Sequence, residues 1–246
     1  MPKIDVKELS VIYGDKKNKD GIVAIDNLSL TFENGSFNVI LGPSGSGKTT
    51  LIQTIIGLLP YYGDVFFDGV NASKIKIPDR DLSYVSQEYV LYPSKSIFDN
   101  IALPLKIKGC EREEIIERVY EIANYYGLTH CLFRKPKHLS GGQQQKVAIC
   151  RALVKDSSLY LFDEPFSNIA ANAREEEARQ LKEYLKKIKA TVIYVTHDIR
   201  EAYLLADKIF VLDKGKLVEK GSVEEINKSM NEIVSGLRRA SFDGNI

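Results

Sequence analysis

The sequence of 246 residues lacks the features of a secreted or membrane-spanning protein. It contains only three cysteines, Cys110, Cys131 and Cys150, which are widely spaced and form no C-x-x-C pair. An odd number of separated cysteines favours reduced thiols in a cytosolic protein over a disulfide framework. The N-terminus shows no apolar signal region, and no apolar run approaches the roughly 18 residues that a bilayer span needs. We therefore expect any role at a membrane to depend on a partner.

A strong charge of one sign is missing as well. The chain has 34 Lys and Arg against 33 Asp and Glu, a formal net charge of +1. This balance argues against a broad electrostatic field for nucleic acid or a membrane surface. Internal repeats and low-complexity tracts are not apparent. An apolar content of 44% and a charged content of 27% are typical of a soluble globular protein with a sizeable core.

The most informative stretch is residues 36–50, S-F-N-V-I-L-G-P-S-G-S-G-K-T-T. An apolar run, Phe37 to Leu41, predicts a buried strand that enters a glycine-rich turn and then a helix. The pattern G-x-x-x-x-G-K-T predicts a P-loop, whose backbone N–H groups and helix N-terminus bind phosphates. Lys48 is expected to reach the β- and γ-phosphates, and Thr49 to ligate Mg²⁺. The predicted phosphate contacts are Gly42, Pro43, Ser44, Gly45, Ser46, Gly47, Lys48, Thr49 and Thr50.

Two carboxylates follow a second apolar run, Leu159 to Phe162. Such a run fits a strand that is buried on both faces of a parallel sheet. In P-loop NTPases an acidic residue at the end of this strand holds Mg²⁺, and Asp163 fits that place. Glu164 is placed to orient or deprotonate the attacking water. Carboxylates can also simply end a strand in solvent, but a P-loop requires an acidic partner.

Other segments predict additions to a mainly parallel sheet. Closely spaced N-terminal strands predict an antiparallel β patch beside the P-loop core. Helical spacing from Lys95 to about Gly127 predicts an inserted helical subdomain, at about 88–155. The helix predicted over Ala173 to Lys189 carries charges that we interpret as a solvated face. The remaining expected strands are Ile4–Tyr13, Ile22–Ile25, Leu28–Phe32, Asp64–Phe67, Leu82–Ser86, Thr191–Val195, Ile209–Leu212 and Leu217–Glu219, followed by a tail from Ser222 that begins as a helix and trails off at Arg238-Arg239.

The string Leu139-Ser140-Gly141-Gly142-Gln143 lies between the P-loop and the L-x-L-F-D-E strand. With its elements in this order from about residue 3 to 225, the chain resembles the ATP-binding cassette (ABC) transporter ATPases. The resemblance implies an α/β P-loop NTPase of ABC type, with a mainly parallel core sheet, an N-terminal antiparallel β subdomain and an inserted helical subdomain. It implies an ABC ATPase domain at 1–225, a short tail at 226–246, ATP and Mg²⁺ as cofactors, and ATP hydrolysis coupled to transport.

The same resemblance assigns roles to individual residues. Tyr13 is expected to stack on adenine, Gln87 to link the γ-phosphate and Mg²⁺ to the helical subdomain, and His197 to contact the γ-phosphate. The family works as a dimer, in which Ser140 and Gly142 of one subunit close over ATP held by the other. The resemblance thus implies the catalytic residues Glu164, His197 and Gln87, the metal ligands Thr49, Gln87 and Asp163, and the nucleotide contacts Tyr13, Ser140, Gly141, Gly142 and Gln143.

Within the family, Leu91-Tyr92-Pro93 and the stretch 100–106, N-I-A-L-P-L-K, are similar to the carbohydrate importer group. This similarity implies a second ATP-binding subunit, transmembrane permease subunits and an extracytoplasmic solute-binding protein as partners, with no nucleic acid. It also implies a peripheral location on the cytoplasmic face of the cell membrane. That group usually carries a further C-terminal regulatory domain, whereas only a short tail follows the last motif here. We therefore expect a chain that is either naturally short or truncated.

The loop Ser167-Asn168-Ile169-Ala170 departs from the family pattern, which has Asp where Ala170 stands. An Asp would accept hydrogen bonds from the facing subunit, and alanine cannot. Two outcomes follow: a weak, slowly hydrolysing homodimer, or pairing with a different cassette whose own loop supplies the Asp. The transported solute and the direction of transport are open at this point.

Other functions compete with a sugar-type importer. One is an importer subunit for a non-sugar solute. Another is a soluble ABC-type ATPase acting on ribosomes or DNA, a class that usually has tandem cassettes, coiled-coil insertions or basic arms. A catalytically dead binder is disfavoured because Lys48, Asp163, Glu164 and His197 are all present. A small-molecule kinase would have no use for the string at 139–143.

Overall fold

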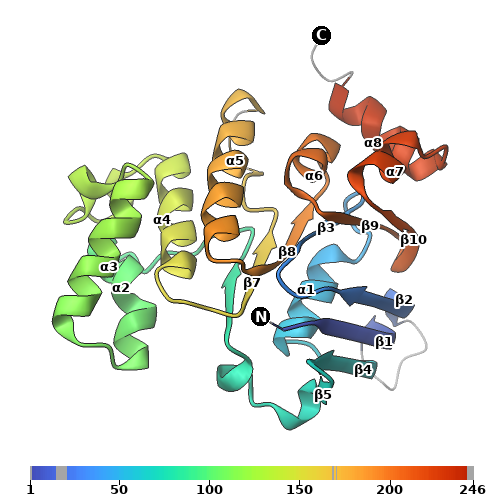
Figure 1. The fold of residues 1–246 in the computed structure, drawn as a ribbon, viewed down its shortest axis with the longest axis horizontal. Coiled ribbons are helices and arrows are strands. Elements are labelled where there is room, and N and C mark those ends of the chain that lie inside the picture. The colour runs from blue at the N-terminus through green and yellow to red at the C-terminus, as the bar shows by residue number, and fades with distance from the viewer. Residues whose placement is uncertain (1, 15–20, 168, 170, 243–246) are drawn as a thin grey trace.

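Two sheets form the centre of the computed structural model, which describes residues 2–14, 21–167, 169 and 171–242 (Figure 1). Neighbouring strands of the larger sheet are parallel, except for the two strands nearest the C-terminus, which form an antiparallel hairpin. The prediction of a mainly parallel core sheet is confirmed. The strand order is β10 (Lys216–Gly221), β9 (Lys208–Asp213), β3 (Phe37–Leu41), β8 (Thr191–Thr196), β7 (Leu159–Asp163) and β6 (Leu82–Val85).

Three adjacent strands of this sheet, β3, β8 and β7, are buried along their whole length. Their near-continuous apolar sequences reflect a sheet covered on both faces. Because the three strands run parallel, their carboxyl ends meet at one edge of the sheet. Leu41 pairs with Thr196, and Val195 pairs with Asp163. The register therefore brings the segments that follow these strands together at that edge.

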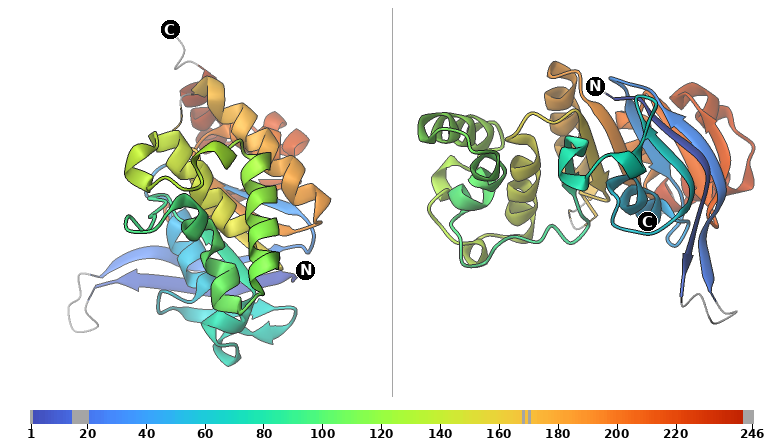
Figure 2. Two further views of the ribbon diagram at one scale, coloured as in Figure 1. Left: turned by 90° about the vertical axis from the view of Figure 1, so that its left-hand side faces the viewer. Right: turned by 90° about the horizontal axis from the view of Figure 1, so that it is seen from below.

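The smaller sheet is antiparallel, as predicted, in the order β2 (Ile22–Phe32), β1 (Ile4–Tyr13), β4 (Tyr62–Phe67) and β5 (Val70–Asn71). The prediction of two separate strands within 22–32 is wrong. One strand continues through an irregularity, with Asn27 at φ 49° and its N–H bonded to Ser10 Oγ. A bulge twists a strand without ending its pairing, and Asn tolerates positive φ. Strands β1 and β2 reach out past the rest of their sheet (Figure 2).

Helix α1 (Lys48–Ile56) fills the space between the two sheets. Its residues Leu51, Ile52 and Ile55 are fully buried in a core with side chains from both sheets. A second core lies on the other face of the larger sheet. It is covered by α2 (Ile97–Lys108), α3 (Arg112–Tyr125), α4 (Gly141–Leu153), α5 (Ala171–Lys187), α6 (Ile199–Leu205), α7 (Val223–Lys228) and α8 (Glu232–Phe242).

Helices α2, α3 and α4 gather at one end of the molecule, away from the small sheet (Figure 1). This arrangement agrees with an inserted helical subdomain, although the bounds 88–155 stay a prediction. The expectation that the chain trails off at Arg238 is wrong, because α8 continues to Phe242. The Arg238 guanidinium donates to the carbonyl oxygens of Ile226 at 2.7 Å and Ser229 at 2.8 Å, which holds α8 against the body. None of the described helices is both long and apolar enough to cross a bilayer.

Candidate functional site

A cavity of about 660 Å³ opens at the edge where the parallel strands end. Segments far apart in the sequence contribute to it, because the register of β3, β8, β7 and β6 aligns their carboxyl ends. Most of the predicted phosphate-binding residues line it, together with Tyr13, Gln87, Glu164 and His197. The lining residues are Tyr13, Ile22, Val23, Ala24, Pro43, Ser44, Gly45, Ser46, Gly47, Lys48, Thr49, Thr50, Gln87, Glu164, His197, Leu237 and Ala240.

Two glycines of the loop between β3 and α1 are required by close backbone contacts. A Cβ on Gly42 would lie 2.2 Å from the carbonyl oxygen of Leu212, and one on Gly47 would lie 2.6 Å from that of Ala24. Gly47 also has φ 98°, a conformation that L side chains rarely adopt. The loop is therefore wedged between β9 and β2 and has little freedom. Such a fixed loop keeps its N–H groups in one orientation.

Replacing Gly42 by alanine is expected to destabilise the fold. Forcing a methyl group into this contact should cost about 1–3 kcal/mol, which corresponds to a fall in Tm of about 3–10 °C for a chain of this size. Thermal unfolding followed by circular dichroism measures the difference. Gly236→Ala is the matched control, because Gly236 lies inside α8 with nothing within 4 Å of an added Cβ, and its Tm should stay level or rise. Equal melting of wild type and Gly42→Ala would contradict the prediction.

Lys48 lies at the floor of the cavity and is only 4% exposed. Its Nζ donates to the carbonyl oxygens of Gly42 at 2.9 Å and Pro43 at 2.8 Å, and lies 3.8 Å from Glu164 Oε1. Burial lowers the pKa of Lys48, while the charges of Glu164 and Asp163 oppose that shift. An ammonium group held by weak carbonyl partners can turn to an anion in the loop, where its hydrogen bonds become charge-assisted.

Thr49 and Asp163 meet at the start of α1. The Thr49 hydroxyl donates to Asp163 Oδ1 at 3.0 Å, and Asp163 is 1% exposed. Burial raises the pKa of Asp163, while hydrogen bonds from Thr49 and Tyr84 lower it. Within the described ranges no three His, Cys, Asp or Glu residues form a metal-binding cluster. A hydroxyl beside one buried carboxylate nevertheless fits Mg²⁺, which takes one or two protein carboxylates and completes its shell with phosphates and waters.

Glu164 holds a strained backbone conformation, with φ 46°. Its N–H donates to the carbonyl oxygen of Val195 at 3.0 Å, which fixes the turn. Positive φ in a residue other than glycine is unfavourable, and such strain gathers at functional sites. The strained turn directs the Glu164 side chain into the cavity, next to His197.

The imidazole of His197 donates from Nδ1 to Glu164 Oε2 at 3.0 Å. This hydrogen bond lowers the pKa of Glu164 and raises the pKa of His197. Glu164 is therefore ionised at neutral pH, the form that can accept a proton. The predicted catalytic pair is thus brought together from the ends of β7 and β8.

Tyr13 and Gln87 also reach the cavity. Tyr13 is 41% exposed, and its hydroxyl lies 3.2 Å from Thr50 Oγ1 at the start of α1. Gln87 follows β6, where the sheet edge continues past β7. An exposed aromatic face beside a phosphate loop suits a stacked base. The stacking role of Tyr13 and the phosphate-sensing role of Gln87 stay predictions.

The string from Ser140 to Gln143 lies elsewhere and is not among the described residues that line the cavity. Ser140 is the N-cap of α4, and its Oγ accepts the Gln143 N–H at 3.3 Å. The Gln143 side chain accepts the Ser140 N–H at 3.1 Å, which completes a capping box. In this chain Gln143 thus stabilises the helix start. The two glycines that follow Ser140 leave an open helix N-terminus, a suitable anion site.

Several cavity residues were not predicted from the sequence. Ile22, Val23 and Ala24 were interpreted only as part of a strand, and Leu237 and Ala240 only as part of a tail. Ile22 and Val23 are 71% and 52% exposed in the structure, but in the sequence they have only the pattern of an ordinary short strand. No sequence signal marks the second, because tertiary contacts bring α8 to the cavity, including its packing beside α6. The departure at Ala170, and Asn168 before it, lie outside the described residues.

The family model described as ABC transporter matches residues 25–167. The chain belongs to the ABC transporter family. That model includes the P-loop, the α4 capping box and the acidic end of β7 in one continuous match.

Several members of the ABC transporter family are similar to much of this chain. The glucose import ATP-binding protein GlcV of Saccharolobus solfataricus is 43% identical over 232 residues, which cover 92% of this chain and 65% of GlcV. The trehalose/maltose import ATP-binding protein MalK of Thermococcus litoralis is 43% identical, with 87% of this chain and 60% of MalK covered. The Fe(3+) ions import ATP-binding protein FbpC 1 of Haemophilus influenzae is 41% identical. The chain spans less than two thirds of each of these ABC relatives.

A solved structure with the same ABC fold covers more of its own length. The ATP-binding cassette MJ0796, solved as a dimer in a post-hydrolysis state bound to ADP and Pi, superposes with a TM-score of 0.81 at 30% identity. The match covers 89% of this chain and 98% of that one. The predicted ABC-type architecture is confirmed by this likeness.

Proposed function

We propose that this chain is the ATP-binding and ATP-hydrolysing subunit of an ABC importer, of the sugar type. One observation carries the proposal: a single cavity is lined by the P-loop with Lys48 and Thr49 and by the Glu164–His197 pair, and the buried Asp163 contacts Thr49 from behind the lining. These groups supply phosphate binding, a metal position and a base within one site. The relatives named as import ATP-binding proteins support the transport part of the proposal.

In the proposed reaction, the N–H groups of the P-loop and the Lys48 ammonium bind the β- and γ-phosphates. Glu164 accepts a proton from a water molecule as the water oxygen bonds to the γ-phosphorus. The bond from that phosphorus to the β–γ bridging oxygen breaks, and ADP leaves with its electron pair. His197 holds the Glu164 carboxylate through the 3.0 Å hydrogen bond, so that the base keeps one orientation. Catalysis is then mainly positioning and charge stabilisation.

A metal ion fits this proposal at Thr49 and Asp163, with Gln87 nearby on the same edge. Mg²⁺ bound there would neutralise charge on the β- and γ-phosphates. Asp163 would then be a ligand and not the base, because its carboxylate faces Thr49. The proposed roles of the two carboxylates differ because Asp163 contacts Thr49 whereas Glu164 contacts His197.

We propose that the active form of this ATPase is a dimer. Ser140, Gly141, Gly142 and Gln143 lie at the open N-terminus of α4, away from the cavity of their own chain. We propose that this helix start closes over ATP held by a second ATP-binding subunit. The solved dimer of a similar cassette bound to ADP and Pi supports this arrangement. The replacement of Asp by Ala170 leaves two candidates for the second subunit: another copy of this chain, or a different cassette whose own loop supplies the Asp.

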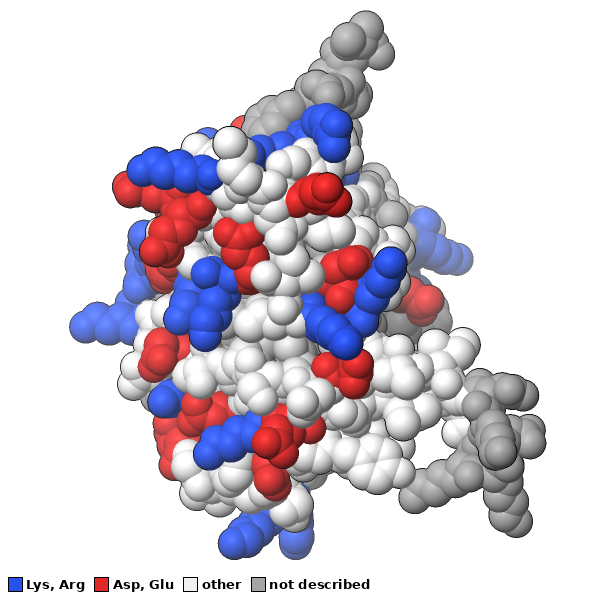
Figure 3. Space-filling view, turned by 90° about the vertical axis from the view of Figure 1, so that its right-hand side faces the viewer, with Lys and Arg blue, Asp and Glu red and all other residues white. Residues whose placement is uncertain are grey.

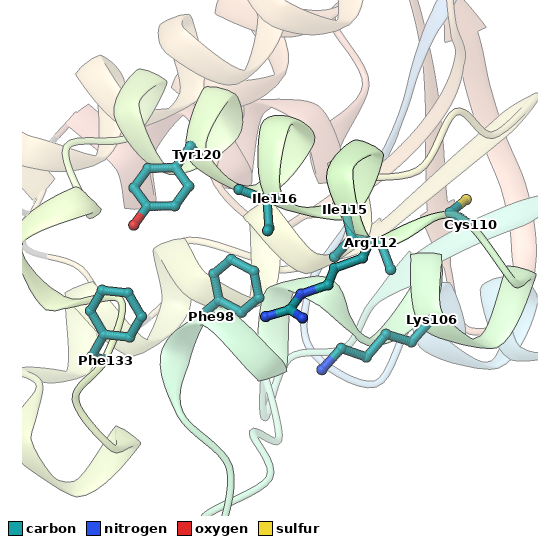
Figure 4. Close-up of a pocket in the computed structure, with 8 residues that line it drawn as sticks. All are labelled: Phe98, Lys106, Cys110, Arg112, Ile115, Ile116, Tyr120 and Phe133. Atoms are coloured by element: carbon teal, nitrogen blue, oxygen red, sulfur yellow. The ribbon is translucent and has the colours of Figure 1, made fainter.

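The proposed docking site for the permease is a groove of about 600 Å³ between α2 and α3 (Figure 4). Apolar side chains from both helices and from the following loop point toward it, including Phe98, Tyr120 and Phe133. Phe133 is 78% exposed and Tyr120 is 41% exposed, which leaves an apolar surface facing solvent. A cytoplasmic helix of a permease is the occupant we propose, because the relatives are named as import subunits. The proposed site combines residues of α2, of α3 and of the loop that carries Phe133.

Cysteine crosslinking tests the groove. Cys110 lies in the groove itself and must first become serine, so that any crosslink comes from the introduced thiol. In that background, Ile116→Cys, which lines the groove, is expected to crosslink to membrane subunits that copurify from native membranes. Lys216→Cys, on the hairpin of β9 and β10, is the control and should not crosslink. Crosslinks from Lys216→Cys alone would refute this docking site.

The remaining expectations form part of the same proposal: an extracytoplasmic solute-binding protein, and a peripheral position on the cytoplasmic face of the membrane. The face shown in Figure 3 has Lys and Arg interspersed with Asp and Glu. A mixed face and a net charge of +1 do not favour a nucleic-acid target.

The decisive experiment has two measurements on the purified wild-type chain. The first is Mg²⁺-dependent release of phosphate from ATP, which is expected. The second is identification of the proteins that copurify with the tagged chain from native membranes, where permease subunits are expected. Absence of hydrolysis would overturn the enzymatic part, and ribosomal or DNA-bound partners would overturn the transport part.

A further inference from the structure

Arg174 occupies an unexpected place, in the first turn of α5. A cation there is disfavoured by the partial positive charge of the helix N-terminus. The charges of this helix were interpreted from the sequence as a solvated face, and for Arg174 that interpretation is wrong. Its side chain is only 16% exposed, whereas that of Arg179 on the same helix is 51% exposed. The contacts of the guanidinium must explain its position.

One side of the guanidinium faces the loop that follows Glu164. Arg174 Nη2 donates to the carbonyl oxygen of Ile169 at 3.1 Å and to that of Ser167 at 3.5 Å. This loop leads from the strained turn at Glu164 to the start of α5. Its carbonyl groups thus share a side-chain donor from the helix that follows.

The other side faces the segment that carries His197. Arg174 Nη1 lies 3.4 Å from Asp198 Oδ2, and Nε lies 3.6 Å from Glu201 Oε1. Both carboxylate side chains are almost completely buried, at 6% and 5% exposure. Asp198 is the residue after His197, and it caps α6 by accepting the Arg200 N–H at 2.9 Å.

Glu201 is anchored from below by the core of the sheet. The hydroxyl of Tyr194 on β8, itself fully buried, donates to Glu201 Oε2 at 2.8 Å. A buried carboxylate that accepts hydrogen bonds also needs a nearby cation. Arg174 supplies this charge to Glu201 and shares with Arg200 the neutralisation of Asp198. The guanidinium is therefore fixed in position by groups on two different elements.

We propose that Arg174 is a positioning residue that joins the loop after Glu164 to the segment after His197 and so keeps the Glu164–His197 pair aligned. The inference rests on the proposed function, because it concerns the base of the proposed ATP hydrolysis. Arg174 is not among the described residues lining the cavity, so it acts through the two loops and not on nucleotide. Movement of either loop would separate Glu164 Oε2 from His197 Nδ1, now 3.0 Å apart.

The contacts also explain why this position holds arginine and not lysine. A guanidinium is planar and has five N–H donors, which can face two carbonyl groups and two carboxylates at once. A lysine ammonium is a single charged centre with three donors. Lysine could neutralise Asp198 or bond to Ile169, but its single charged centre does not match two carbonyl groups of the loop together with the carboxylates of Asp198 and Glu201. Arg174→Lys should keep the fold and lose part of the alignment.

The experiment compares steady-state ATP hydrolysis by wild type, Arg174→Ala, Arg174→Lys and Arg179→Ala. Loss of alignment is expected to lower kcat by about 10-fold to 100-fold in Arg174→Ala, with the KM for ATP within about threefold because the P-loop is untouched. Arg174→Lys should fall between wild type and Arg174→Ala. Guanidinium ion at low, non-denaturing concentration should partly restore kcat in Arg174→Ala and have no effect on wild type. Arg179→Ala is the matched control and should hydrolyse ATP as wild type does.

The outcomes separate this role from the proposed function. Absence of hydrolysis by wild type would overturn the proposed function, and with it the role of Arg174. Normal hydrolysis by wild type with a kcat of Arg174→Ala within about twofold would overturn the role of Arg174 alone. If Arg174→Ala fails to fold, the kcat of Arg174→Lys tests the inference instead. Lysine keeps the positive charge beside the two buried carboxylates, so this variant is expected to fold. A folded Arg174→Lys with wild-type kcat, or with a change in KM only, would also overturn the inference.

Discussion

Replacing Glu164 by glutamine is expected to abolish nearly all ATP hydrolysis while leaving ATP binding close to wild type. A positioned general base contributes about 10²-fold or more to rate, and glutamine cannot accept the proton of the attacking water. The substitution keeps the size of the side chain and one oxygen that can accept from His197. The binding groups, the P-loop N–H groups and Lys48, are unchanged. The effect should therefore appear in kcat and not in affinity.

Two measurements on the same preparation check this expectation. Phosphate release at saturating ATP should fall by about 100-fold or more, and the Kd for a fluorescent ATP analogue should stay within about threefold of wild type. Glu176→Gln serves as the control, because Glu176 is 74% exposed on α5 and makes only a surface pair with Arg179. Turnover near wild type in Glu164→Gln would show that Glu164 is not the base and would make Asp163 the candidate for that role.

Replacing Lys48 by alanine is expected to act on binding itself. Lys48 is the buried cation at the floor of the phosphate loop, within 3 Å of two loop carbonyl oxygens. Charge-assisted hydrogen bonds to buried groups are worth about 1.5–3 kcal/mol each, so losing the ammonium should weaken ATP affinity by about 10-fold to 100-fold. Glu164 and Asp163 would also lose their neighbouring positive charge, which adds repulsion between these carboxylates and the phosphates.

Equilibrium binding of ATP, measured by isothermal titration or by an ATP analogue, checks the second prediction. Lys228→Ala on α7 is the control for loss of a lysine, since Lys228 is exposed and lies outside the cavity lining. An unchanged Kd would show that the backbone N–H groups alone hold the phosphates. The Glu164 and Lys48 variants thus separate the chemical step from the binding step.

The amino-acid sequence determined those features whose chemistry is local. The P-loop is a continuous string in which glycine, lysine and threonine are each needed at fixed spacing, so Gly42 to Thr50 could be recognised before any fold was known. The apolar runs that became β3, β7 and β8 predicted buried parallel strands, since a strand covered on both faces leaves no polar alternation. From these runs it also followed that Asp163, Glu164 and His197 lie at the carboxyl edge of the sheet.

The tertiary structure decided the features that depend on contacts between distant segments. Strand β2 continues through Asn27 because its partner β1 keeps pairing on both sides of the irregularity. Helix α8 reaches the cavity because Arg238 ties it to carbonyl groups on the preceding segment. Arg174 points inward because buried carboxylates of α6 lie next to the start of α5. None of these contacts has a local sequence pattern, since each links groups whose separation along the chain says nothing about their separation in space.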